Sequence, residues 1–268
     1  MRATIVRAGA REWIVIGFCA AITAAVFLIV EPVPQPQSYH QFADRRPLLG
    51  ISNGFDVLSN VPFAFVGLLA LRFLRRTAPP QPVTERRAYT VLFLGVLLTS
   101  VGSAFYHVAP SDRRLVWDRL PMTIGFMGFF AAVIGERISD RWGQVALAPL
   151  LVIGAGSVAY WYLGESRGVG DLRPYLLVQF VPLAAILLMM VLYEPKYTHG
   201  GLIVVAIGLY GVAKICELYD RAISSLGVSG HTLKHLVSAA AVYTLFVMLK
   251  RRRPVSVRWD TQSQVQKV

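Results

Sequence analysis

Five polar residues, set in three apolar stretches of the chain, have the types and spacing of a hydrolytic metal site. They are Ser103, His107, Asp118, His231 and His235. Residues four apart on a helix share a face, so the first two and the last two of them each form a same-face pair. Ionisable clusters inside hydrophobic spans are costly and therefore usually mark function. Three imidazoles with a hydroxyl and a carboxylate are the parts of a catalytic zinc site with one open position.

Such a site predicts a division of labour among the five side chains. His107, His231 and His235 would hold the metal, which lowers the pKa of a bound water to about 7. Ser103 would hydrogen-bond that water or a developing oxyanion. Asp118 would accept the proton of the water or orient a ligand histidine. The pattern therefore predicts metal-assisted hydrolysis of an acyl bond.

The composition predicts one integral membrane domain. Of the 268 residues, 55% are hydrophobic and 16% are charged, and the mean hydropathy is +0.52. The net charge of +12 would suit nucleic acid. The arginines, however, lie between apolar spans rather than along one polar face, which indicates membrane orientation instead. Cys19 and Cys216 both fall in apolar stretches, so no disulfide framework is predicted.

The fold class predicted from these stretches is an all-α integral membrane protein. Eight apolar stretches have roughly the ~20-residue length that a helix needs to cross the hydrocarbon core of a bilayer. They are residues 13–30, 56–74, 88–107, 115–134, 144–162, 174–192, 201–218 and 230–249.

The predicted organisation has three parts. Residues 1–37 form an anchor helix and linker, residues 38–250 form the helical membrane domain, and residues 251–268 form a basic, disordered cytoplasmic tail. Arginines before the first stretch also fit a secretory signal. The length of that stretch and the lack of a small-x-small site before Glu31 favour a retained anchor.

Lysine and arginine predict the orientation of the spans. These basic residues are concentrated in the loops on the same side of the membrane as the N-terminus. Because such loops usually face the cytoplasm, we predict that both termini are cytoplasmic. The predicted location is the inner membrane of the cell. Span 88–107 then ends at the outer face, where spans 115–134 and 230–249 begin. Three remote segments thus deliver all five polar residues to one depth near the outer face, which is the main argument for a shared site.

The order of these motifs resembles the CREST superfamily of membrane hydrolases, and within it bacterial members of the alkaline ceramidase branch. The resemblance rests on Ser103-x3-His107, an aspartate eleven residues later, and His231-x3-His235 on the last span. The segment 56–63, Asp-Val-Leu-Ser-Asn-Val-Pro-Phe, is similar to the first-core-helix motif of that branch, and residues 40–46 resemble its bacterial members. The resemblance covers roughly residues 38–250.

The resemblance implies a seven-helix core to which helix 13–30 is added. It implies zinc held by the three histidines, assisted by the serine and the aspartate. The implied reaction is hydrolysis of the amide bond of a ceramide-like membrane lipid to a sphingoid base and a fatty acid. Related members bind calcium through an acidic cluster. Here Asn53 stands where a glutamate is expected, with only Asp44 and Asp56 nearby, so calcium is left out of the predicted site.

Other interpretations use the same residues. The chain could be an adiponectin-receptor-like lipid-binding protein with a structural zinc site, a related lipid acyl or ester hydrolase, or a small transporter. A Ser-His-Asp nucleophile is weaker, because no GxSxG elbow surrounds Ser103 and because His231 and His235 would have no role.

Several charged residues near the histidines have expected places of their own. Lys234 is expected on another helix face, with its amine extended towards the membrane interface. Glu217 and Asp220 are expected to pair with Lys214 and Arg221 at that interface. His40 and His199 are expected in loops and are given no role.

Overall fold

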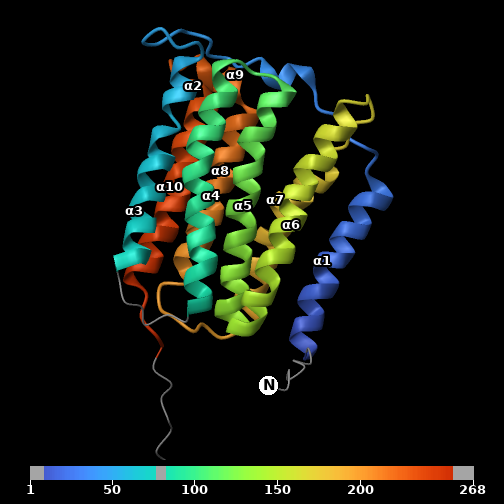
Figure 1. Cartoon of the computed structure of the whole chain (residues 1–268), viewed down its shortest axis with the longest axis vertical. Coiled ribbons are helices and arrows are strands. Elements are labelled where there is room, and N and C mark those ends of the chain that lie inside the picture. Colours follow the sequence, from blue (N-terminus) through green and yellow to red (C-terminus); the bar gives the residue numbers. More distant parts are fainter. Residues whose placement is uncertain (1–8, 77–82, 256–268) are drawn as a thin grey trace, which may run out of the picture.

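The computed structural model describes residues 9–76 and 83–255, which form a bundle of long helices running side by side (Figure 1). The predicted all-α class is confirmed. The long helices are α1 (Ala10–Ile29), α3 (Val61–Arg76), α4 (Val83–Val108), α5 (Asp112–Arg137), α6 (Asp140–Glu165), α7 (Arg173–Leu192), α8 (Gly201–Leu218) and α10 (Gly230–Arg251). Three short helices lie between them: η1 (Gln37–His40), α2 (Gly54–Leu58) and α9 (Asp220–Ser224).

Among the described residues, seven helices, and not the predicted eight, are long and apolar enough to cross a membrane. α2 and α3 count together as one of them, Gly54–Arg76. The helix that falls short is α5, which carries Asp118 and Arg119 near its start and Glu136 and Arg137 at its end. These four side chains are buried in the bundle. Charges that face the protein interior therefore lower the hydropathy of a helix that is nevertheless central to the fold.

Both ends of the described chain lie at one end of the bundle. α1 begins, and α10 finishes, at the end opposite to α2 and α9 (Figure 1). α1 packs chiefly against α7, and most of its side chains are exposed. The side of the membrane that each end faces and the division of the chain at residue 37 stay predictions. Residues 1–8, and the tail from residue 256 onwards, lie outside the described residues.

Small residues let α4 and α5 approach closely. A Cβ atom added to Gly102 would overlap the carbonyl oxygen of Trp117, and one added to Gly95 would lie 2.5 Å from the backbone nitrogen of Gly125. Glycines at such crossings bring helix backbones together in membrane proteins. The close approach sets the last turns of α4 against the first turns of α5.

Serines at helix starts fix where two of the site-bearing helices begin. The Ser111 hydroxyl accepts from the backbone N–H of Arg114 at the start of α5, and Ser229 accepts from the backbone N–H of Thr232 at 2.9 Å at the start of α10. Such N-caps satisfy donors that a helix cannot satisfy itself.

The predicted span 56–74 is broken after its first turn. Ser59 and Asn60 separate α2 from α3, and both side chains donate to the carbonyl oxygen of Asp56, at 3.0 and 2.8 Å. Backbone groups freed inside a membrane bundle need such partners. The break places the hydroxyl of Ser59 in the interior.

We predict that Gly102→Ala will destabilise the fold and disturb the site, because the new methyl group forces α4 away from α5. Overpacking of this kind costs about 1–3 kcal/mol. Thermal unfolding of the purified protein should show a lowered Tm. Gly156→Ala on α6 is the matched control, since nothing lies within 4 Å of the added carbon. Equal Tm values for the two variants would contradict the close α4–α5 packing.

Candidate metal centre

Three histidine rings converge at the end of the bundle where α4 finishes and α10 begins. The ring centroids of His107, His231 and His235 are 4.7, 4.9 and 4.8 Å apart, which is close to an equilateral triangle. Each residue is at most 3% exposed. One nitrogen from each ring lies within 4.8 Å of the others. The prediction that these imidazoles meet is confirmed, and the buried cluster could hold a metal ion.

The spacing and chemistry of the cluster fit a tetrahedral zinc ion. Nε2 of His231 and Nε2 of His107 are 3.3 Å apart. Two nitrogens bound at ~2.0–2.1 Å to one tetrahedral zinc are separated by about 3.3 Å. Nδ1 of His107 is buried without a hydrogen-bond partner in the protein. A cation shared by the rings would compensate for burying so many imidazole nitrogens together.

Ser59 fixes the orientation and tautomer of His235. Its hydroxyl lies 2.7 Å from Nδ1 of His235 and 3.0 Å from the carbonyl oxygen of Asp56. The carbonyl can only accept, so the single hydroxyl proton goes to it, and Nδ1 of the imidazole must then donate to the hydroxyl oxygen. Nε2 of His235 is left with its lone pair free for a metal. Partners of this kind orient metal-binding histidines.

Two further contacts hold the backbone of the other histidines. Asn53 donates from Nδ2 to the carbonyl oxygen of His107 at 2.8 Å. Asp220 accepts from the backbone N–H of His231 at 2.8 Å and from that of Ala43 at 2.9 Å. Asp220 forms no ion pair with Arg221 among the described residues, so that predicted pairing is wrong, and the aspartate instead contacts the backbone of a site histidine.

The two acids considered for calcium make contacts within the protein. Asp56 accepts from the hydroxyls of Thr232 at 2.7 Å and Ser229 at 3.1 Å, which ties α2 to the start of α10. Asp44 forms an ion pair with Arg46 at 2.6 Å. The hydrogen bond from that guanidinium lowers the pKa of the Asp44 carboxyl below its ordinary value.

Residues 31–53 form a strap that covers the histidines. The Phe42 ring lies 4.6 Å from the His107 ring and 4.6 Å from the His231 ring, measured between centroids. His40, which the sequence analysis left without a role, contacts the Tyr106 hydroxyl at 2.8 Å and the Asp112 carboxylate at 3.0 Å. The strap thereby shields the histidine cluster. The contact of Phe42 with the histidines could not be predicted, because an aromatic residue in a loop has no sequence pattern that indicates its partner.

Ser103 and Asp118 lie at the same end of the bundle as the histidines. Both are buried, at 2% and 6% exposure. Both line a cavity that His235 also lines. The catalytic roles assigned to the two side chains stay a prediction.

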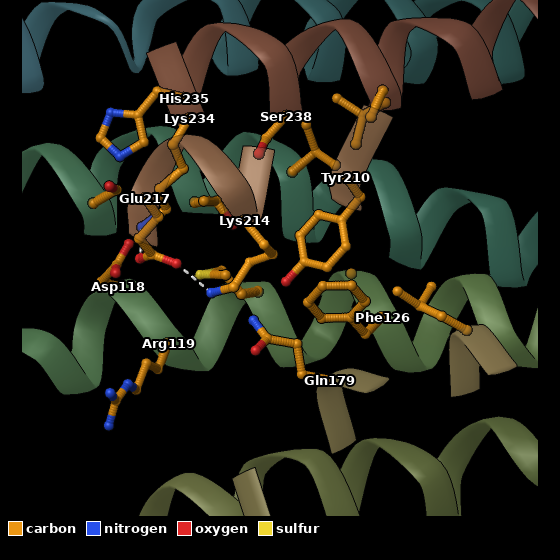
Figure 2. A pocket seen from close by; sticks show the side chains of 18 of the residues that line it. Asp118, Arg119, Phe126, Gln179, Tyr210, Lys214, Glu217, Lys234, His235 and Ser238 are labelled. Atoms are coloured by element: carbon orange, nitrogen blue, oxygen red, sulfur yellow. Dashed lines mark hydrogen bonds and ion pairs between the residues drawn. The ribbon is translucent and has the colours of Figure 1, made fainter. Parts of the chain in front are cut away.

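The cavity has a volume of about 270 Å³ and runs between α4, α5, α7, α8 and α10. Figure 2 shows His235, Asp118 and Glu217 gathered at one end, and Phe126 and Tyr210 towards the other. Most of its walls are apolar, as a lipid chain requires. α7 and α8 both line the cavity, but they are not closely packed against each other.

Lys234 does not extend to the membrane interface as predicted. Its side chain is 12% exposed, and Nζ lies 2.6 Å from Glu217 Oε1, inside the polar end of the cavity. Glu217 also pairs with Lys214, which confirms that part of the prediction, and it accepts from the Tyr39 hydroxyl at 3.0 Å. Burial, reinforced by Glu217, raises the pKa of Tyr39 well above its ordinary value, so this hydroxyl stays protonated as the donor.

The chain matches no protein-family model and no curated protein. Its own structure describes it as a protein with seven helices long and apolar enough to cross a membrane and a buried cluster of three histidines. The likeness to membrane ceramidases rests on motif order and spacing.

We predict that Ser59→Ala will weaken zinc binding about 10–100-fold, the usual effect of losing the partner of a ligand histidine. Competition with a chelator of known affinity would measure it. Ser157→Ala on α6 is the control, because that buried hydroxyl donates only to the carbonyl of Gly154. Full zinc content in both Ser59→Ala and His235→Ala would overturn the ligand assignment.

Proposed function

We propose that the protein is a zinc-dependent membrane amidase that cleaves the amide bond of ceramide-like lipids. The observation that carries the proposal is the buried histidine cluster beside an apolar cavity that Ser103, Asp118 and His235 line together. A metal site and a lipid-sized cavity in one place suit hydrolysis of a lipid better than either feature alone. The order of the motifs, which resembles that of the alkaline ceramidases, supports the same reaction.

We infer that α5 crosses the membrane as an eighth span. It runs beside α4 from one end of the bundle to the other (Figure 1), and its charged side chains are buried in the protein rather than exposed to lipid. Polar residues on a spanning helix are tolerated when they face the bundle interior. An even number of crossings returns a chain to the side where it started. Eight crossings therefore agree with the start of α1 and the finish of α10 at the same end of the bundle.

Lateral access from the bilayer suits this cavity. An acyl chain is already dissolved in the membrane, and α7 and α8, which make little contact with each other, both line the cavity. A chain lying along the apolar walls would bring its amide to the polar end beside Asp118 and His235. On the predicted orientation that end lies near the outer face of the inner membrane.

The chemistry divides between the metal and the surrounding side chains. Zinc, when bound, would polarise the amide carbonyl and lower the pKa of the attacking water. The Asp118 carboxylate would accept a proton from that water and return it to the leaving nitrogen. The Ser103 hydroxyl would donate a hydrogen bond to the oxygen that gains negative charge. A C–O bond forms, the C–N bond breaks, and a fatty acid and an amine are released.

We predict that Asp118→Asn will lower kcat for ceramide hydrolysis about 10²–10⁴-fold while zinc content and Tm are kept, because the amide cannot accept the proton. Lipid turnover by the zinc-loaded protein, followed by mass spectrometry, measures this. Asp140→Asn, at the start of α6, is the control. Stoichiometric zinc with no amide hydrolysis, and a large loss of Tm on chelation, would instead indicate a structural zinc site in a lipid-binding protein.

A further inference from the structure

One buried arginine beside the proposed reaction site has no carboxylate to neutralise it. Arg119 lies next to Asp118 on α5, lines the cavity and is 5% exposed. Within the described part of the chain, no acidic side chain is in ion-pair range of its guanidinium. Nη2 donates to Gln35 Oε1 at 2.6 Å, but Nη1 is buried without a partner. An unpaired buried charge is costly, so its presence calls for an explanation.

Aromatic rings hold the Arg119 guanidinium in place. Its Cζ lies 4.2 Å from the ring centroid of Trp161, 4.6 Å from that of Tyr175 and 5.8 Å from that of Tyr39. Cation–π contacts attract a guanidinium without cancelling its charge. The arginine is therefore positioned and keeps its capacity to bind an anion.

The polar end of the cavity carries an excess of positive charge. Its charged lining residues are Arg119, Lys214, Lys234, Asp118 and Glu217, so three cations face two carboxylates. Glu217 already accepts from both lysines and from a tyrosine hydroxyl. Its single negative charge is thus shared by two lysines, and it forms no ion pair with Arg119. Figure 2 shows Asp118, Glu217, Lys234 and the Lys214 amine grouped together, while the Arg119 guanidinium points away from that group.

This charge balance favours some ligands over others. A neutral head group with hydroxyls alone could accept a hydrogen bond from Arg119 Nη1 but would leave one positive charge unmatched. A carboxylate would supply both the missing charge and acceptors for the guanidinium, which binds carboxylates in a fork geometry. Arg119 and Asp118 both line the cavity but project from different faces of α5, so the carboxylate would lie beside Tyr175 and Gln35, away from the Asp118 carboxylate.

We propose that Arg119 binds a carboxylate on the head group of the substrate, and that the preferred substrate is an N-acyl amino acid rather than a neutral ceramide. This rests on the proposed amide hydrolysis but changes the preferred lipid amide from a neutral ceramide to one with an anionic head group. Water attacks the acyl carbon, a C–O bond forms and the C–N bond breaks, and the nitrogen gains a proton from the water. The products are a fatty acid and a free amino acid, with no oxidant or reductant involved.

Two lipids that differ only in charge test the proposal. N-palmitoylglycine and N-palmitoylethanolamine share the chain and the amide, but only the first has a carboxylate. Binding of each to the metal-free full-length protein in nanodiscs, followed by tryptophan fluorescence, gives a readout independent of catalysis. We expect the glycine conjugate to bind about tenfold tighter or more to the unaltered protein, as a charge-assisted hydrogen bond provides.

The expected change in the variants is specific to the arginine. Arg119→Gln should bring the two affinities to within about twofold, because the charged donor is lost, and Arg119→Lys should keep part of the difference. Arg114→Gln on the same helix, whose side chain bonds to the Phe105 carbonyl, should keep all of it. If Arg119→Gln does not fold, the partly exposed Lys214→Gln should still reduce the difference. Equal binding of the two lipids to the unaltered protein would overturn the proposal.

A third lipid and turnover assays distinguish the remaining outcomes. Palmitate tests whether the arginine serves the product: if only palmitate binding depends on Arg119, the substrate assignment is overturned. If the charge preference is present but no amide is hydrolysed, the anion site stands and the proposed function fails. If ceramide is hydrolysed and the glycine conjugate has no advantage, the proposed function stands and the anion site fails.

Discussion

Polar groups buried in an apolar helical bundle must find their partners within the protein, and the rest of this structure depends on that constraint. No water reaches such groups cheaply, so each unmatched donor or charge is costly. At His235 the constraint is met by a relay through the Ser59 hydroxyl to the carbonyl of Asp56. These hydrogen bonds decide which imidazole nitrogen of His235 faces the cluster. The contacts that satisfy the buried Ser59 and Asp56 groups therefore also orient a ligand for a metal.

Close helix packing turns these local solutions into a site. Glycines allow α4 and α5 to touch along their backbones, so that the end of α4 lies against the start of α5. That contact brings Ser103 and Asp118 to the wall of the same cavity. The strap then adds Phe42 over two of the histidine rings. The chemistry proposed for the site is therefore a consequence of backbone approach as much as of residue identity.

The two ends of the bundle use charge differently. At the end where α10 finishes, Arg252 pairs with Glu85 at 3.0 Å and with Glu136 at 2.8 Å, and all three side chains are buried. That network joins the chain after α10 to α4 and α5, and its paired charges hold helices together. At the other end, Arg119 has no acidic partner among the described residues, and the cavity is lined by three cations and two carboxylates. This difference in charge pairing between the two ends is the basis of the proposed anion site.

The sequence by itself determined the helical class, the approximate helix positions and the meeting of three histidines, because apolar length and i, i+4 spacing are local properties. The sequence predicted eight spans, whereas seven of the described helices are long and apolar enough to cross a membrane. The difference is α5, because hydropathy cannot show whether its charges face lipid or protein. The tertiary structure decided the partners: Lys234 with Glu217, Ser59 with His235, and the aromatic rings of Trp161 and Tyr175 with Arg119. These contacts join residues remote in the chain, and only the packing of the helices sets which of them meet.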